Sequence, residues 1–281
     1  MNNINIALII KNSNSKLLRK LPGFAVGWIA KIIRQKEMNA ILDKYSDFEG
    51  IDFLDKIIEE FEIKAVFEGF ENLPENGKCF FVANHPFGLL DGLLLTFIVG
   101  SKYGRLKAIG NDAFMFIPNL RPLVLNVNVF GKNKRKHFIE LNKVFSSDVP
   151  ITHFPFGVVS RISKFRIQDE FWHKSFVTKA IEYERDIVPV RIYGRNSNLF
   201  YTIYILRNVF RIKLNIELIL LPRELFRKKG ETVYVKIGKI IHCSNLAESL
   251  SHWEWAQKIR SEVYLIRHNN LQYYENKRKS F

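Results

Sequence analysis

The chain has 281 residues, a formal net charge of +15 at pH 7, 47% hydrophobic residues and 24 phenylalanines. This composition excludes disordered, collagenous and low-complexity chains and predicts an ample buried core. The basic excess favours anionic partners, namely lipid headgroups, nucleic acid or phosphorylated metabolites, or else serves solubility alone.

Residues 17–45 are expected to be helical, with a break at Pro22 and Gly23. Apolar residues recur there at helical spacing and form one stripe, flanked by lysines and arginines: Leu21, Phe24, Ala25, Trp28, Ile29, Ile32 and Ile33. Such a helix suits a membrane interface, and it equally suits docking on its own domain. Amphipathicity does not decide between the two.

The uncharged apolar stretches 21–30 and 92–100 are much shorter than the roughly 18 residues that span a bilayer. The N-terminus also lacks the pattern of a signal peptide. We therefore expect a cytoplasmic protein, peripheral on the inner face of the cytoplasmic membrane. Two cysteines are too few for a disulfide framework.

Strands and helices alternate after a second predicted helix at 52–61. Strands are predicted at 64–67, 78–83, 106–109, 123–129, 151–154, 187–192 and 232–240, and helices at 92–99, 134–145, 174–184 and 247–266. The alternation predicts an α/β fold with a mostly parallel or mixed central sheet flanked by helices. We divide the chain into an N-terminal amphipathic helical extension, 1–62, and an α/β domain, 63–281.

His85 and Asp91 carry the most suggestive chemistry. His85 follows a predicted strand, and Asp91 stands where the next helix should have its N-cap. A carboxylate that accepts a hydrogen bond from one imidazole nitrogen leaves the other nitrogen free to act as a base. The alternative is that His85 merely ends a strand and Asp91 merely caps a helix. The spacing alone favours neither.

Other common sites find no support. The remaining histidines show no pair at metal-ligand spacing, so no metal is expected. A Gly-x-Ser-x-Gly elbow is absent, and so are the Walker and Gly-x-Gly-x-x-Gly phosphate loops.

The segment Asn84-His85-Pro86-Phe87-Gly88-Leu89-Leu90-Asp91-Gly92 resembles the first signature block of the glycerophospholipid acyltransferase superfamily. Its five-residue spacer between His and Asp, where most members have four, is similar to a bacterial hemolysin-like subgroup. That subgroup includes enzymes that acylate ornithine and glycine lipids.

Three further stretches follow the superfamily order. Residues 154–161 (Phe-Pro-Phe-Gly-Val-Val-Ser-Arg) resemble the third block, with Phe156 in place of the usual Glu. Residues 187–201 resemble the fourth block, and 116–121 is a weaker second block whose Arg121 stands two positions late. Because this Glu is missing, we do not expect lysophosphatidic acid to be the sole acceptor.

The resemblance implies an acyltransferase in which Asp91 orients His85, and His85 deprotonates an acceptor that attacks a thioester. It implies no bound cofactor, acyl-CoA or acyl carrier protein as donor, and a glycerolipid or amino-acid lipid as acceptor. Oxyanion donors are expected among backbone N–H groups near Gly88 or Gly157. The full set of expected substrate contacts is Asn84, Gly88, Gly157, Ser160, Arg161 and Arg121.

Arg161 is the leading candidate for binding an acidic headgroup, because a guanidinium binds phosphate or carboxylate in a bidentate manner. Its alternative is a structural ion pair with Asp169 or Glu170. Expected partners are a membrane lipid surface, the donor and the acceptor, and no nucleic acid. Two other functions stay open: a non-catalytic basic lipid- or nucleic-acid-binding protein, and a thioesterase or lipase with water as acceptor.

Overall fold

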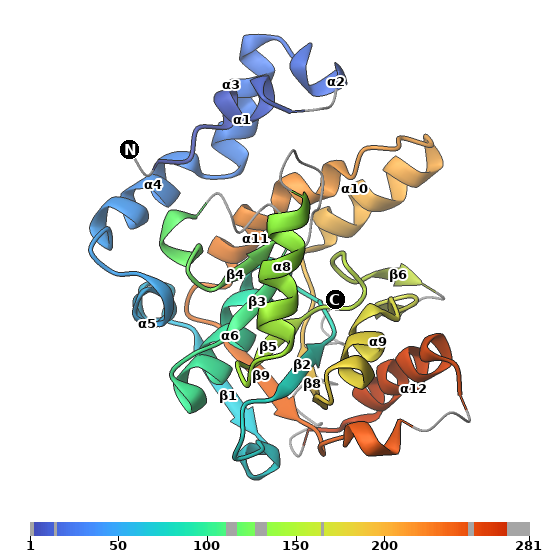
Figure 1. The fold of residues 1–281 in the computed structure, drawn as a ribbon. Helices are drawn as coiled ribbons and strands as arrows, with labels where there is room; N and C mark the ends of the chain where they lie inside the picture. Colours follow the sequence, from blue (N-terminus) through green and yellow to red (C-terminus); the bar gives the residue numbers. More distant parts are fainter. Residues whose placement is uncertain are drawn as a thin grey trace.

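A computed structural model describes residues 3–13, 16–110, 117–126, 134–163, 166–246 and 250–268. Its centre is a seven-stranded sheet in the order β1-β9-β8-β2-β5-β3-β4 (Figure 1). The strands are β1 (Lys64–Glu68), β2 (Cys79–Ala83), β3 (Lys107–Gly110), β4 (Val124–Asn126), β5 (Ile151–His153), β8 (Asp186–Tyr193) and β9 (Thr232–Ile237). A separate antiparallel hairpin joins β6 (Arg161–Ser163) to β7 (Arg166–Gln168).

The sheet is mostly parallel, as predicted. Five strands, β8, β2, β5, β3 and β4, run in one direction. β9 pairs antiparallel with β8 and parallel with β1, so these two strands run the opposite way. The loops that follow β2, β5 and β8 therefore leave from one edge of the sheet, where open α/β sheets bind ligands.

Helices cover both faces of the sheet, because β2 is buried on both sides. Cys79, Phe81 and Ala83 belong to one core, while Phe80 and Val82 point into the other. The first core includes α5 (Gly50–Glu60), α6 (Leu89–Tyr103) and α11 (Leu221–Arg227). The second includes α8 (Lys134–Phe145), α9 (Ser175–Glu182) and α12 (His252–Leu265).

The N-terminal extension is helical, but it is more broken than predicted. It contains α1 (Ile6–Lys11), α2 (Lys16–Arg19), α3 (Gly23–Ile32) and α4 (Gln35–Lys44). The second break follows from Arg34, whose φ of 56° is left-handed and incompatible with a continuous helix. The apolar stripe is split as well: Ile33 is buried, whereas Phe24 and Trp28 are exposed.

The predicted boundary at residue 62 stays a prediction. Buried residues on both sides of it, such as Leu42, Phe53 and Leu94, share one core.

Several elements of the α/β domain were not predicted from the sequence. They are α10 (Asn198–Val209), the β6–β7 hairpin, α11 and the short 3-10 turns η1 (Phe70–Asn72), η2 (Pro118–Leu120), η3 (Ile216–Leu220) and η4 (Cys243–Asn245). Part of the predicted strand 123–129 and part of the predicted helix 247–266 lie outside the described residues.

No helix in the described part of the chain is both long enough and apolar enough to cross a bilayer.

Candidate active site

The loop that carries His85 begins where β2 ends, and Asn84 fixes its start. The Asn84 side chain donates to the carbonyl oxygen of Ile192 and accepts from the Ile192 N–H, both at 2.8 Å. The amide thus continues the pairing of β2 with β8 by one further residue. In this structure the Asn84 side chain is buried and engaged with backbone, and its predicted substrate contact stays a prediction.

Asp91 begins no helix, which corrects the predicted N-cap. Helix α6 starts two residues earlier at Leu89, and Gly88 is its N-cap. Asp91 lies in the first turn, where its Oδ2 accepts hydrogen bonds from the N–H groups of Phe87 at 2.7 Å and Gly88 at 2.8 Å. Gly88 has a φ of 90°, which L side chains rarely adopt, and a Cβ would also lie 2.8 Å from Leu221. The tight loop therefore wraps its own N–H groups around the Asp91 carboxylate.

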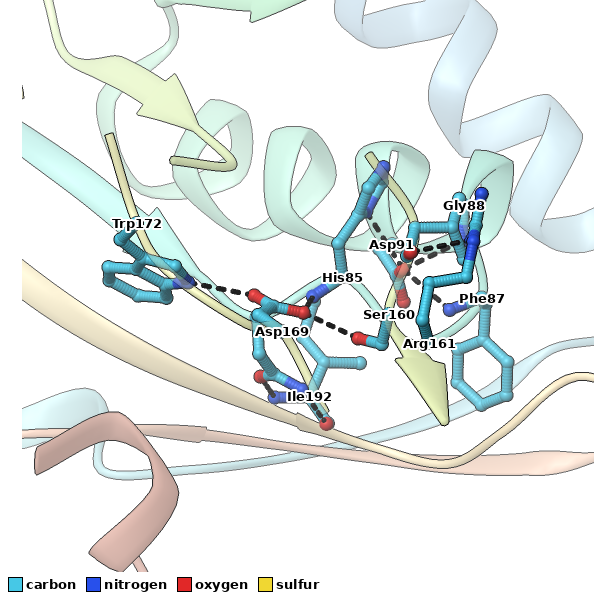
Figure 2. A network of polar contacts seen from close by, with 11 residues as sticks. His85, Phe87, Gly88, Asp91, Ser160, Arg161, Asp169, Trp172 and Ile192 are labelled. Carbon is cyan, nitrogen blue, oxygen red and sulfur yellow. Dashed lines mark hydrogen bonds and ion pairs between the residues drawn. The ribbon is translucent and has the colours of Figure 1, made fainter. Parts of the chain in front are cut away.

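His85 and Asp91 lie together, as the spacing allowed. His85 Nδ1 is 3.0 Å from Asp91 Oδ2, and the two side chains are 13% and 0% exposed (Figure 2). The imidazole stacks on Phe154, with ring centroids 4.1 Å apart. The contact with Asp91 and the stacking on Phe154 fix the orientation of the imidazole ring. Its other nitrogen, Nε2, does not contact Asp91.

The charges around this pair are shaped by burial. Burial raises the pKa of Asp91, while the contact with His85 and the two N–H donors act in the opposite direction. His153, at the end of β5, is also near His85, and burial lowers its pKa to about 4. A neutral His153 adds no positive charge beside His85 at ordinary pH.

The third block meets the first through backbone. The Ser160 N–H donates to the carbonyl oxygen of His85 at 2.7 Å, and the Ser160 hydroxyl donates to Asp169 Oδ1 at 2.5 Å. Asp169 Oδ2 accepts from the Trp172 indole at 2.8 Å, and Oδ1 lies 3.4 Å from the His85 N–H (Figure 2). The buried Asp169 carboxylate thus ties the His85 loop to the third block.

Oxyanion donors near Gly88 or Gly157 stay a prediction, but the N–H groups of these two glycines are themselves engaged within the loops. The Gly88 N–H is bonded to Asp91, and the Gly157 N–H donates to the carbonyl oxygen of Phe154 at 2.9 Å. Within the described residues, the N–H groups of Phe156, Val158 and Val159 donate no hydrogen bond. These three belong to the same loop that stacks on and bonds to His85.

Arg161 occupies a structural ion pair, although with a partner other than those predicted. Its Nη2 lies 3.0 Å from Glu217 Oε1, and Arg207 Nε lies 2.9 Å from the other Glu217 oxygen. Both Arg161 and Glu217 are buried, and burial lowers the pKa of Arg161. A headgroup role for Arg161 stays a prediction. Arg121 is exposed at the end of η2, a turn that packs against α5, and its role also stays a prediction.

Two residues near the site went unrecognised in the sequence. Asp169 was considered only as an ion-pair partner, because a single Asp after a hairpin carries no motif. Asn196 is buried, and its amide has no hydrogen-bond partner among the described residues. The neighbouring Gly194 allows this loop to reach the first block, since a Cβ there would lie 1.8 Å from the Phe87 ring. The position of Asn196 just after the strand of the fourth block was the signal in the sequence that could have indicated a place near the site.

Within the described residues, no group of three or more His, Cys, Asp or Glu side chains forms a candidate metal site.

Comparisons with known proteins agree on one class. A family model described as Acyltransferase matches residues 8–272. A lyso-glycine lipid O-acyltransferase from Phocaeicola vulgatus is 37% identical over 264 residues, which are 94% of this chain and 95% of that protein. A protein of the same name from Bacteroides thetaiotaomicron is 34% identical, covering 94% of this chain and 97% of its own.

Among solved structures, the 1-acyl-sn-glycerophosphate (LPA) acyltransferase PlsC from Thermotoga maritima is similar with a TM-score of 0.47 and 16% identity. The similarity covers 88% of this chain and 91% of that one.

Proposed function

The chain belongs to the acyltransferase family, and we propose that it transfers a fatty acyl group from a thioester donor to the hydroxyl of a lipid acceptor through His85 and Asp91. The observation that carries the proposal is the 3.0 Å contact between His85 Nδ1 and the buried Asp91 carboxylate. The donor is acyl-CoA or acyl carrier protein, and no bound cofactor takes part.

The proposed acceptor is a lyso-glycine lipid, and the acceptor atom is its hydroxyl oxygen. Two relatives at 34% and 37% identity over nearly the whole chain carry that activity in their names. Phe156 in the third block, in place of a carboxylate, supports an acceptor other than lysophosphatidic acid.

The proposed reaction has one base and no acyl-enzyme. With its Nδ1 proton directed at Asp91, His85 has the Nε2 lone pair available to take the acceptor hydroxyl proton. The acceptor oxygen then forms a bond to the thioester carbonyl carbon. When the tetrahedral intermediate collapses, the carbon–sulfur bond breaks and the leaving thiolate takes the proton from His85.

The developing oxyanion needs N–H donors that are not already engaged. Phe156, Val158 and Val159 supply such groups in a loop held against His85 by the Phe154 stack and the Ser160 hydrogen bond. We therefore propose that the oxyanion donors near Gly157 are the N–H groups of these three residues.

The proposed partner surface is a lipid bilayer, at the inner face of the cytoplasmic membrane. Phe24 and Trp28 of α3 are 78% and 73% exposed, and Val209 and Phe210 at the end of α10 are 68% and 70% exposed. Both helices contact η3, and they lie at the same end of the molecule (Figure 1). Large exposed apolar side chains beside basic residues suit an anionic lipid interface.

The test is purified protein with lyso-glycine lipid and either acyl-CoA or acyl carrier protein, read out by mass spectrometry of the lipid product and by thiol release. The proposal expects diacylated glycine lipid in step with thiol. Free fatty acid at saturating acceptor would instead assign a thioesterase. Binding of lipid or nucleic acid without thiol release would assign a non-catalytic binding protein.

A further inference from the structure

A pocket of about 380 Å³ is lined by Arg166, Ile167, Gln168, Arg191 and Tyr264. These residues come from β7, β8 and α12, which lie far apart in the sequence. The lining carries two guanidinium groups and no carboxylate. Its charge therefore favours an anion.

Arg191 is the unusual member of this lining. Its Nε and Nη1 atoms are buried and have no hydrogen-bond partner among the described residues. The guanidinium lies over the Tyr264 ring, 4.0 Å from its centroid. The stacking holds the plane in place without using the N–H groups. Buried guanidinium N–H groups without an acceptor are costly, which indicates that an acceptor is supplied from outside the described part of the chain.

The pocket adjoins the network that holds His85. Gln168 precedes Asp169, which accepts the Ser160 hydroxyl. The Tyr264 hydroxyl in turn accepts from the Asp169 N–H at 2.6 Å. Arg191 precedes Ile192, whose backbone pairs with the Asn84 side chain. Because side chains alternate along β8, Arg191 points to the face opposite the core that holds Ile192 and α6. The pocket thus lies behind the His85 loop, across the sheet from Asp91.

We propose that Arg191 and Arg166 form a binding site for an anionic oxygen group, a carboxylate or a phosphate, carried by one of the two substrates. A planar guanidinium binds either group with paired hydrogen bonds. The acceptor would offer the carboxylate of its glycine, and the donor would offer the phosphates of its carrier. This inference rests on the proposed acyl transfer for its kinetic test, and a direct anion-binding measurement tests it independently.

The kinetic experiment removes the anion from one substrate and the cation from the protein. Acceptors are lyso-glycine lipid and its methyl ester, donors are acyl-CoA and acyl-pantetheine, and proteins are wild type, Arg191→Met and Arg166→Gln. Removing from the substrate the anion that the pocket binds should raise the KM of wild type about tenfold or more. The same removal should raise the KM of Arg191→Met much less. Coupling to the methyl ester assigns the acceptor carboxylate, and coupling to acyl-pantetheine assigns the donor phosphate.

Arg166 is exposed, so Arg166→Gln should fold normally and show the same coupling if Arg191→Met does not fold. The control is Arg105→Met, an exposed arginine that precedes β3 at the opposite edge of the sheet. The direct arm measures thermal stabilisation by inorganic phosphate against chloride of equal ionic strength. The proposal expects stabilisation of wild type and Arg105→Met and its loss in Arg191→Met and Arg166→Gln.

If wild type turns over no substrate, the proposed function fails. The phosphate measurement still tests whether the pocket binds an anion. Equal KM ratios in all proteins, together with phosphate stabilisation that is absent or is unchanged in Arg191→Met and Arg166→Gln, would overturn the site.

Discussion

The N–H of Ser160 donates a hydrogen bond to the carbonyl oxygen of His85 across 2.7 Å. This single bond joins the loop after β2 to the loop after β5, two loops that leave neighbouring parallel strands. It holds the proposed base on one loop and the proposed oxyanion donors on the other in fixed relation. We therefore expect substitutions on both loops to affect turnover even where the residue touches no substrate.

Asp91→Asn should lower kcat by about a hundredfold or more, because a neutral amide does not stabilise the imidazolium and its NH2 can donate to Nδ1, which favours the wrong histidine tautomer. The variant also loses the best acceptor for the N–H groups of Phe87 and Gly88. Steady-state kinetics on variants of His85, of Asp91 and of both tests whether the two act as one unit. If the double variant loses the product of the two single effects, the residues act independently and the dyad is refuted.

Asp169→Ala should destabilise the protein by about 3 kcal/mol, because it leaves the Trp172 indole and the Ser160 hydroxyl buried without an acceptor. It should also lower kcat, since the two loops lose one of their ties while the Ser160 N–H bond to His85 remains. Urea unfolding followed by circular dichroism measures the first effect. Asp148→Ala, at an exposed position, is the matched control. Equal unfolding midpoints for both variants would remove Asp169 from this role.

The α/β class and the strand at residues 78–83 could be predicted from local pattern, because buried strands show continuous apolar runs. The His85–Asp91 pair was predicted from the resemblance of residues 84–92 to a known motif, since the spacing alone favoured neither interpretation. The partner of Arg161 could not be predicted, since Glu217 is 56 residues away and is brought close only by η3. Which N–H groups near Gly88 and Gly157 are free could not be predicted, because sequence does not show which way an N–H points.

The helical start at Leu89 shows the same limit. Asp91 suits an N-cap by residue type, but Gly88 adopts the positive φ that ends the loop earlier and moves the carboxylate into the first turn. That shift is what directs Asp91 toward its own loop and His85.

His153 predicts a specific acid sensitivity. Its pKa falls from 6.5 to about 4 on folding, so between these values the unfolded chain binds more protons than the native one. The free energy of unfolding should therefore decrease as pH falls through this window, by up to about 1.4 kcal/mol per pH unit from this group. Above pH 6.5 the group contributes no slope. Chemical unfolding of wild type and His153→Gln across pH 4 to 7.5 tests this, and identical slopes would contradict it.

The exposed apolar residues of α3 and α10 are proposed to bind a membrane, so their removal should weaken binding to anionic vesicles. Phe24→Ser with Trp28→Ser should lower the affinity for phosphatidylglycerol vesicles about tenfold or more, and Val209→Ser with Phe210→Ser should act similarly. Phe70→Ser is the control, because Phe70 is 53% exposed in η1, after β1, at the other edge of the sheet. Vesicle co-sedimentation measures all three. A loss equal to that of the control would place lipid contact elsewhere.

The most direct test of the central claim is the turnover number of His85→Ala, measured as thiol release with saturating lyso-glycine lipid and acyl-CoA or acyl carrier protein. With the proposed base removed, kcat should fall by about a thousandfold, and circular dichroism at the assay temperature confirms that the variant is folded. Turnover equal to wild type in a folded His85→Ala protein would contradict the account.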